Sequence, residues 1–94
     1  MNEFWHDEAW ADYEWWRGQD RKTFLRINQI IRDIERKDDR FTGRPEPLGG
    51  DWAGWWGVRI DSENCLVFRF ADQGIVILSC RGHHGDWETH GEFP

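Results

Sequence analysis

The order of its hydrophobic repeats constrains the fold of this 94-residue chain more than any other feature. Apolar residues recur at helical spacing through residues 7–37, and strand-length apolar runs follow at residues 55–60, 66–70 and 75–81. Short polar turns separate these runs, and Trp5 near the start is expected in a further short strand. Helices followed by a strand meander predict an α+β domain, with two N-terminal helices packed on a twisted, mainly antiparallel sheet of four to five strands.

The helical segment is expected to form an αα-hairpin. In its first part Ala9, Tyr13 and Trp16 repeat at intervals of three and four residues. Gly18 is predicted to stop this helix and Asp20 to cap the next one. The second helix is expected to end near Lys37 and to bury Phe24, Ile27, Ile30, Ile31 and Ile34. Its opposite face is charged, which is typical of a solvated helix face, and carries Arg21, Lys22, Arg26, Arg32 and Arg36.

Side chains alternate along a strand, so the strand register decides which residues face the core. We expect Ile60 opposite Leu66, which gathers one apolar set on the core side: Trp56, Val58, Ile60, Leu66, Phe68 and Phe70. For the third run we place Val76, Leu78 and Cys80 on the core side, because the reverse choice would bury Arg81 without a partner. The other side of the sheet then carries Arg59, Cys65, Val67, Arg69, Ile77, Ser79, Arg81 and His83.

The formal net charge of −6 argues at first against a nucleic-acid partner, which usually meets an excess of Lys and Arg. All twelve Lys and Arg lie between Arg17 and Arg81, however, together with ten acids, so this segment carries a net charge of +2. A weakly basic body with acidic ends is compatible with RNA binding.

Neither export nor membrane insertion is indicated. The N-terminus lacks a basic start and an apolar signal segment, and no apolar run approaches the roughly 20 residues that span a bilayer. Two cysteines, Cys65 and Cys80, are too few for a disulfide framework. We therefore expect a reduced, cytoplasmic protein without a membrane partner.

Glu46 lies between Pro45 and Pro47, which exclude a helix and hold the backbone extended. A surface glutamate in a proline-rich turn is the ordinary interpretation. A carboxylate, an imidazole and guanidinium groups are, however, the set that metal-free RNA cleavage requires, to move two protons and to hold phosphorane charge. From spacing alone, Glu46 with Arg59, Arg81 and His83 indicates a possible nuclease.

The adjacent histidines His83 and His84 would point to opposite faces of an extended strand, so they are poorly placed to chelate one metal. His90 does not complete a recognised zinc pattern with them. We therefore expect no metal site and no cofactor.

The motifs together resemble the YoeB (Txe) toxins of the RelE ribonuclease superfamily. The shared pattern covers about nine tenths of the chain, up to His84, and its most specific part is the box Gly43-Arg44-Pro45-Glu46-Pro47-Leu48. The other matching positions are Trp5, Trp10, Asp12-Tyr13, Trp16, Asp20, Ile27-Asn28, Gly54-x-Trp56, Arg59-Ile60, Leu66-Val67 and Cys80-Arg81-x-His83.

The resemblance implies a toxin that enters the A site of the 70S ribosome and cuts mRNA there, leaving a 2′,3′-cyclic or 3′-phosphate and a 5′-OH. It implies that Glu46 is the general base, His83 the general acid and Arg59 a phosphate-stabilising cation. Substrate contacts are expected at Arg44, Arg81 and His84. A YefM-type antitoxin is implied as the neutralising partner, and a homodimer as the assembly.

This chain departs from the family at three places. Cys65 stands where the family has a catalytic arginine, and a neutral thiol cannot hold phosphate charge; losing such a group typically costs ~10²–10³ in rate. The terminal aromatic of the family is replaced by His84. Residues 85–94 extend beyond the usual end, so we divide the chain into a toxin domain, 1–84, and a C-terminal extension in which Trp87 is expected to pack on the body.

Three hypotheses follow from these departures. The first is an active ribosome-dependent endoribonuclease, attenuated by Cys65. The second is a catalytically attenuated toxin-fold protein that acts mainly by binding its antitoxin and regulating its own operon. In the third, Cys65 and His83 serve a thiol enzyme or bind metal, although nothing in the spacing places a base beside the thiol.

Overall fold

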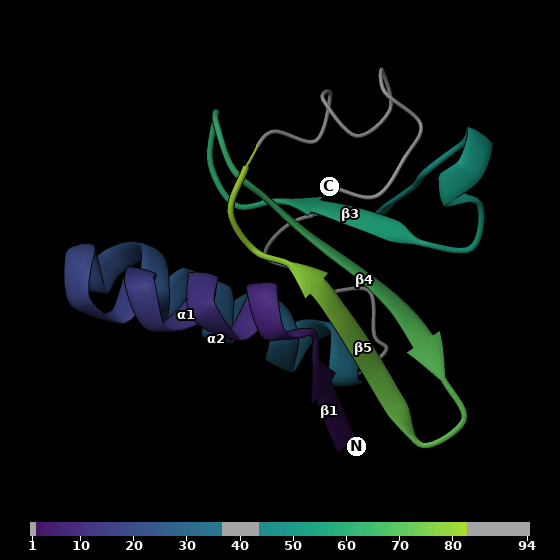
Figure 1. Cartoon of the computed structure of the whole chain (residues 1–94), viewed down its shortest axis with the longest axis horizontal. Coiled ribbons are helices and arrows are strands. Elements are labelled where there is room, and N and C mark those ends of the chain that lie inside the picture. Colours follow the sequence, from purple (N-terminus) through teal and green to yellow (C-terminus); the bar gives the residue numbers. More distant parts are fainter. Residues whose placement is uncertain (1, 37–43, 83–94) are drawn as a thin grey trace.

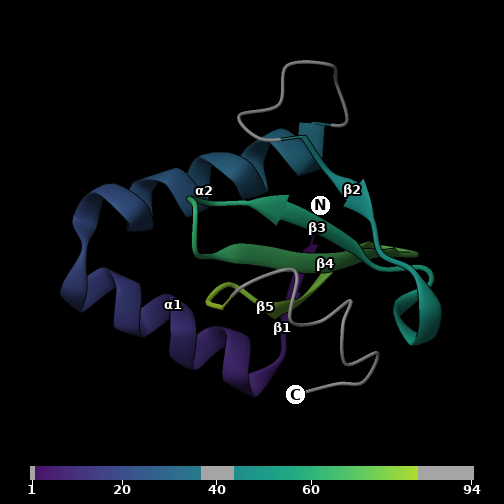
Figure 2. The same ribbon diagram turned by 90° about the horizontal axis from the view of Figure 1, so that it is seen from above.

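Two helices cover one face of a five-stranded sheet (Figure 1, Figure 2). The computed structural model describes residues 2–36 and 44–82. Its elements, in chain order, are β1 (Asn2–Trp5), α1 (Asp7–Gln19), α2 (Arg21–Arg36), β2 (Glu46–Pro47), a short 3-10 helix (Gly50–Trp52), β3 (Trp56–Arg59), β4 (Cys65–Ala71) and β5 (Gly74–Ser79). The predicted α+β class is confirmed. Neither described helix is long and apolar enough to cross a membrane.

The strands follow the order β1-β5-β4-β3-β2. Only β1, which contains Trp5 as predicted, runs parallel to its neighbour β5; the other pairs are antiparallel. Gly74 lies against the backbone of Asn2, where a Cβ atom would come within 1.9 Å of the Asn2 carbonyl oxygen. A glycine at this position therefore allows β1 to join the edge of the sheet.

A single residue, Asp20, connects the two helices of the hairpin. Its N–H donates to the carbonyl oxygen of Trp16 (2.9 Å) at the end of α1, and its Oδ1 accepts from the N–H of Thr23 (3.2 Å) at the start of α2. The hydrogen bonds from Thr23 lower the pKa of Asp20. The predicted cap is confirmed, whereas the predicted stop at Gly18 is wrong. Gly18 does not adopt the positive φ of a glycine stop, and α1 continues to Gln19, with the backbone becoming extended at Asp20.

The main core lies between the helices and the sheet. The predicted apolar face of α2 is confirmed, since Ile27, Ile30, Ile31 and Ile34 are all buried there. They pack with Ala9 and Trp16 of α1 and with residues from the sheet and its ends: Val58, Ile60, Leu66, Phe68, Ile75, Ile77 and Cys80. A second, smaller cluster on the other face contains Leu48, Trp52, Val67 and Leu78, with Trp55 packed against it.

The predicted register of β3 and β4 is wrong by two residues. Val58, and not Ile60, lies opposite Leu66, because Ile60 already belongs to the turn, where its N–H donates to the carbonyl oxygen of Asn64 (2.8 Å). A shift of two residues leaves every side chain on its predicted face. Val58, Leu66 and Phe68 therefore face the helices as expected, while Phe70 is partly exposed.

The predicted facing of β5 is wrong in its first part and right at its end. Ile75 and Ile77 face the helices, whereas Leu78 belongs to the second cluster. Val67 pairs with Ser79 and Phe68 with Ile77, so Leu78 is an extra residue that forms a bulge. The bulge resets the alternation, and the core receives Ile77 and Cys80 while Arg81 stays exposed.

Candidate functional site

Glu46 and Arg59 lie on the same face of the sheet, turned away from the helices. Glu46 is the Cα partner of Gly57, and Gly57 is two residues before Arg59 on β3. Diagonal neighbours of this kind have Cα atoms about 7–8 Å apart, within reach of long side chains. Both residues are exposed. The predicted extended backbone at Glu46 is confirmed as strand β2.

We call this surface the distal face; Glu46, Gly57, Arg59, Cys65, Val67 and Ser79 define it. One cross-strand row runs from Glu46 through Gly57 and Val67 to Ser79. Gly57 has no side chain to separate Glu46 from the rest of the face. A second row, two residues along, pairs Arg59 with Cys65. Glu46 and Arg59 therefore lie on neighbouring rows of one face.

Cys65, at the position where the family resemblance implies an arginine, is the direct cross-strand partner of Arg59. Its side chain is buried, with 4% of its surface exposed. The other cysteine, Cys80, is fully buried in the main core, where burial and the nearby Asp12 raise the pKa of its thiol to about 12. A buried thiol is poorly suited to serve as a nucleophile, which weakens the thiol-enzyme hypothesis.

The backbone before His83 is attached to the turn between β3 and β4. The N–H of Cys65 donates to the carbonyl oxygen of Gly82 (2.8 Å), and the N–H of Gly82 donates to Oδ1 of Asn64 (3.0 Å). Gly82 has a φ angle of +113°, a conformation that favours glycine. His83 and His84, the predicted acid and substrate contact, lie outside the described residues, as do residues 85–94 with Trp87 and His90.

The comparisons with known proteins decide the family. A model described as a YoeB-like toxin of a bacterial type II toxin–antitoxin system matches residues 5–84. The chain belongs to the YoeB toxin family. It is 44% identical to Toxin YoeB of Streptomyces coelicolor over 76 residues, which are 81% of this chain and 90% of the relative. The predicted resemblance is thereby confirmed, and the chain is a toxin of the kind found in toxin–antitoxin systems.

Solved YoeB structures share the fold. The YoeB/ParE toxin from Agrobacterium tumefaciens is 36% identical, with a TM-score of 0.82 over 89% of this chain and 100% of that one. Staphylococcus aureus YoeB, solved as a dimer, is 30% identical, with a TM-score of 0.81 over 89% and 98%. In the structure of its complex with YefM, the matching chain is 29% identical, with a TM-score of 0.80 over 89% of this chain and 98% of that one.

In this YoeB domain Arg81, one of the two remaining predicted cations, contacts helix α1. The Arg81 guanidinium carbon lies 3.8 Å from the ring centroid of Trp15 on α1, a cation–π contact. Arg81 also attracts the carboxylate of Asp12, whose pKa is nevertheless raised because burial outweighs the hydrogen bond from Cys80 and this attraction. Arg44, the residue before Pro45, is exposed.

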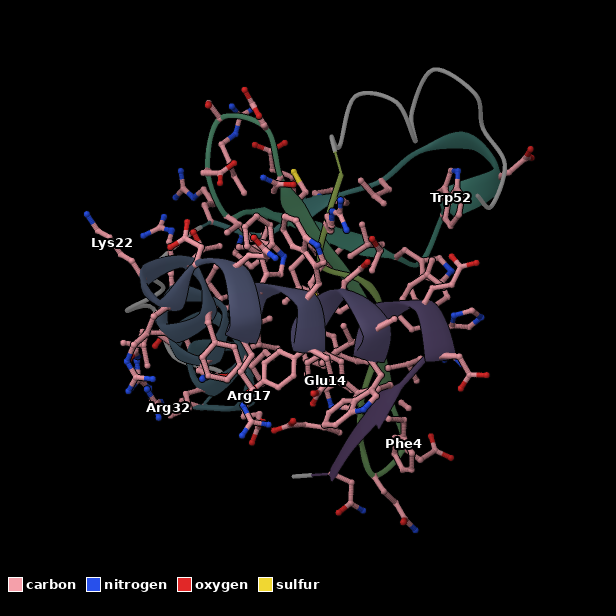
Figure 3. The ribbon with its side chains drawn as sticks, turned by 60° about the vertical axis from the view of Figure 1, so that its left-hand side comes forward. Phe4, Glu14, Arg17, Lys22, Arg32 and Trp52 are labelled. Atoms are coloured by element: carbon pink, nitrogen blue, oxygen red, sulfur yellow. The ribbon has the colours of Figure 1, made fainter. Side chains whose placement is uncertain are left out.

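The helices carry exposed cations of their own. Arg17, Lys22 and Arg32 extend outward from the helices (Figure 3), away from Trp52 in the second cluster. The predicted charged face of α2 is confirmed as exposed, although Arg26 also donates to the carbonyl oxygen of Ile60 (2.5 Å). Within residues 2–36 and 44–82, no group of three or more His, Cys, Asp or Glu side chains could hold a metal ion.

Sequence reasoning missed Asp61 and Asn64, which organise the β3–β4 turn. Oδ1 of Asp61 accepts from the N–H groups of Glu63 and Asn64, both at 2.8 Å. An aspartate that begins a short polar connection is a typical signal of such a side-chain-closed turn. That signal predicts the turn, but not the bond from its Asn64 side chain to Gly82.

Proposed function

We propose that this toxin is a ribosome-dependent endoribonuclease that cuts mRNA in the A site of the 70S ribosome. The observation that carries the proposal is the position of Glu46 beside Arg59 on the distal face, next to the turn that binds Gly82. These are the positions at which the family resemblance implies the base, a phosphate-binding cation and the approach to the acid His83.

In the proposed reaction the Glu46 carboxylate takes the proton of the ribose 2′-OH, and the 2′ oxygen attacks the neighbouring phosphorus. The bond from phosphorus to the 5′ oxygen breaks, and His83 protonates that leaving oxygen. Arg59 stabilises the charge that develops on the phosphorane. The products are a 2′,3′-cyclic phosphate, which water can open to a 3′-phosphate, and a 5′-OH. Two proton transfers and one cation complete the step, so the mechanism needs no metal or cofactor.

Cys65 sets the expected level of activity. The missing arginine would stand directly opposite Arg59 and share the phosphorane charge with it. Its loss is expected to slow cleavage by about 10²–10³-fold, because one stabilising donor is missing from the transition state. Arg44, Arg81 and His84 are proposed as substrate contacts. The replacement of the family arginine by Cys65 leaves these three residues in place.

The proposed partners follow from the relatives. Staphylococcus aureus YoeB has been solved with YefM and as a dimer. We infer a YefM-like antitoxin that covers the active residues of this toxin, and a homodimer, in the cytoplasm with the ribosome. The toxin domain is proposed to occupy residues 1–84, followed by the extension 85–94.

The test incubates the purified protein with programmed 70S ribosomes and maps the mRNA ends by primer extension. A cut at the A-site codon, absent with His83→Gln or Glu46→Ala, supports the proposed mechanism. A cut that persists in both variants contradicts the assigned roles.

The alternative is an attenuated toxin that acts mainly by antitoxin binding and regulation of its operon. The observation that favours it is the neutral, buried Cys65 in the family's arginine position. No cut by the wild type, restoration of cutting by Cys65→Arg, and tight binding of the antitoxin by both would establish this function. Unchanged cleavage in Cys65→Arg would contradict the role given to this position.

A further inference from the structure

The side chain of Asn64 holds the backbone from which His83 continues. Gly82 is bound at both of its polar groups: its N–H donates to Oδ1 of Asn64 (3.0 Å), and its carbonyl oxygen accepts from the N–H of Cys65 (2.8 Å). These two partners are consecutive residues of one turn. Since Gly82 is covalently joined to His83, the two bonds hold the residue that directly precedes His83.

Asp61 fixes the orientation of the Asn64 amide. Nδ2 of Asn64 donates to both carboxylate oxygens of Asp61, at 3.1 and 3.2 Å. If the amide were flipped, its NH₂ group would face the Gly82 N–H and its carbonyl oxygen would face the carboxylate. Only the observed orientation satisfies all of these donors and acceptors. Asp61 itself is held by the N–H groups of Glu63 and Asn64.

The same turn begins at Arg59. Arg59 pairs with Cys65, and the next residue, Ile60, donates its N–H to the carbonyl oxygen of Asn64 (2.8 Å). The turn therefore begins at the proposed phosphate-binding cation and is hydrogen-bonded to the segment after β5, which leads to the proposed acid. Without the side chain of Asn64, the Gly82 N–H loses its partner in the turn.

We propose that Asn64, oriented by Asp61, is a positioning residue that sets the place of His83 relative to Arg59. The inference rests on the proposed function, since it assigns Asn64 a role in that reaction. A general acid must come within hydrogen-bond distance of the leaving oxygen, and a displacement of about 1 Å can cost ~10²-fold in rate. We expect Asn64→Ala to lower the single-turnover cleavage rate by roughly 10- to 100-fold.

Exchanging the side chains of Asp61 and Asn64 is expected to restore the positioning that the single variants lose. In Asn64→Asp alone, the new carboxylate faces that of Asp61, and their repulsion should disturb the turn. In Asp61→Asn with Asn64→Asp, the amide at position 61 can donate to the carboxylate at position 64, which can still accept from Gly82. The double variant also keeps the net charge. Ser62→Ala is the matched control, because Ser62 is an exposed residue of the same turn.

Three readouts separate positioning from a loss of folded protein. Hydrogen exchange of the Gly82 N–H reports the bond to Asn64 directly. The pH profile of single-turnover cleavage reports the acid, whereas a smaller folded fraction lowers the rate without moving the profile. The His83 imidazole resonances, assigned with His83→Gln, report its surroundings even in a chain that does not cut.

The expected result is faster Gly82 exchange, a lower rate and an altered pH profile in Asn64→Ala, all restored by the swap and unchanged in Ser62→Ala. Faster Gly82 exchange with wild-type rate and profile would overturn the inference while leaving the proposed function intact. If wild type does not cut and His83→Gln changes nothing, the proposed function fails separately. The imidazole resonances then decide: displacement by Asn64→Ala with recovery in the swap supports positioning, and unmoved resonances overturn it.

Discussion

The indole N–H of Trp16 donates to the carbonyl oxygen of Cys80 at 2.9 Å and joins helix α1 to the end of β5. Both residues are buried in the main core, and they are 64 residues apart in the sequence. The bond lies two residues before Gly82, so it also anchors the segment that leads to His83. It is therefore a tertiary contact on which both the packing of α1 and the candidate site depend.

Trp16→Phe should destabilise the protein, because it leaves the buried Cys80 carbonyl oxygen without this donor. An unpaired buried acceptor costs about 1–3 kcal/mol, and the smaller ring adds a packing loss. The free energy of unfolding, measured with urea, checks this. Trp10→Phe is the control, since Trp10 is half exposed and contacts neighbouring rings. Equal losses in the two variants would contradict a specific role for the Trp16 bond.

Glu35 near the end of α2 should make stability depend on pH. A hydrogen bond with the carboxyl group of Glu3, helped by burial, raises the pKa of Glu35 from 4.5 to about 7. Between these values the folded protein binds more protons than the unfolded chain. The stabilisation from the protonated Glu35 is therefore complete below about pH 4.5 and is lost as the pH rises through about 7.

We expect the urea midpoint of the wild type to fall between about pH 5 and about pH 8, and Glu35→Gln to remove most of this fall. Glu14→Gln is the control, because Glu14 lies on exposed α1 surface 3.9 Å from Arg17. An equal fall in wild type and Glu35→Gln would show that the pair with Glu3 does not form in solution.

Two glycine-to-alanine variants should change stability in opposite directions. Gly82 has a φ angle of +113°, where a Cβ atom brings strain of about 1–3 kcal/mol, so Gly82→Ala should lower the unfolding free energy. Gly18 lies inside α1 with open space around it, so Gly18→Ala should raise the unfolding free energy by up to ~1 kcal/mol. Urea unfolding of the two variants checks both signs, and a stabilised Gly82→Ala would contradict the described backbone conformation at Gly82.

The sequence predicted the elements and most faces of this fold because they depend on local periodicity. The α2 core positions followed from the spacing of the isoleucines, and Arg59 reached its predicted face because a register error of two residues preserves the alternation. The pairing of Glu46 with Gly57, which brings Glu46 to the same face, was not predicted. The bulge at Leu78 could not be predicted, since it depends on pairing with β4. The bond from Asn64 to Gly82 joins residues 18 apart, and no local pattern encodes it.

Arg59 and Arg69 provide the sharpest test of the candidate site, because both are exposed arginines on the distal side of adjacent strands. Arg59 lies diagonally from Glu46, whereas the guanidinium of Arg69 lies over the Trp55 ring, 5.3 Å from its centroid. Arg59→Ala should lower the single-turnover cleavage rate by about 10²–10³-fold, since it removes charge stabilisation from the transition state. Arg69→Ala should leave that rate nearly unchanged while removing the same charge from the surface. Equal losses in both would indicate a general contribution of positive charge to RNA binding, and would contradict a specific role for Arg59 at the phosphate.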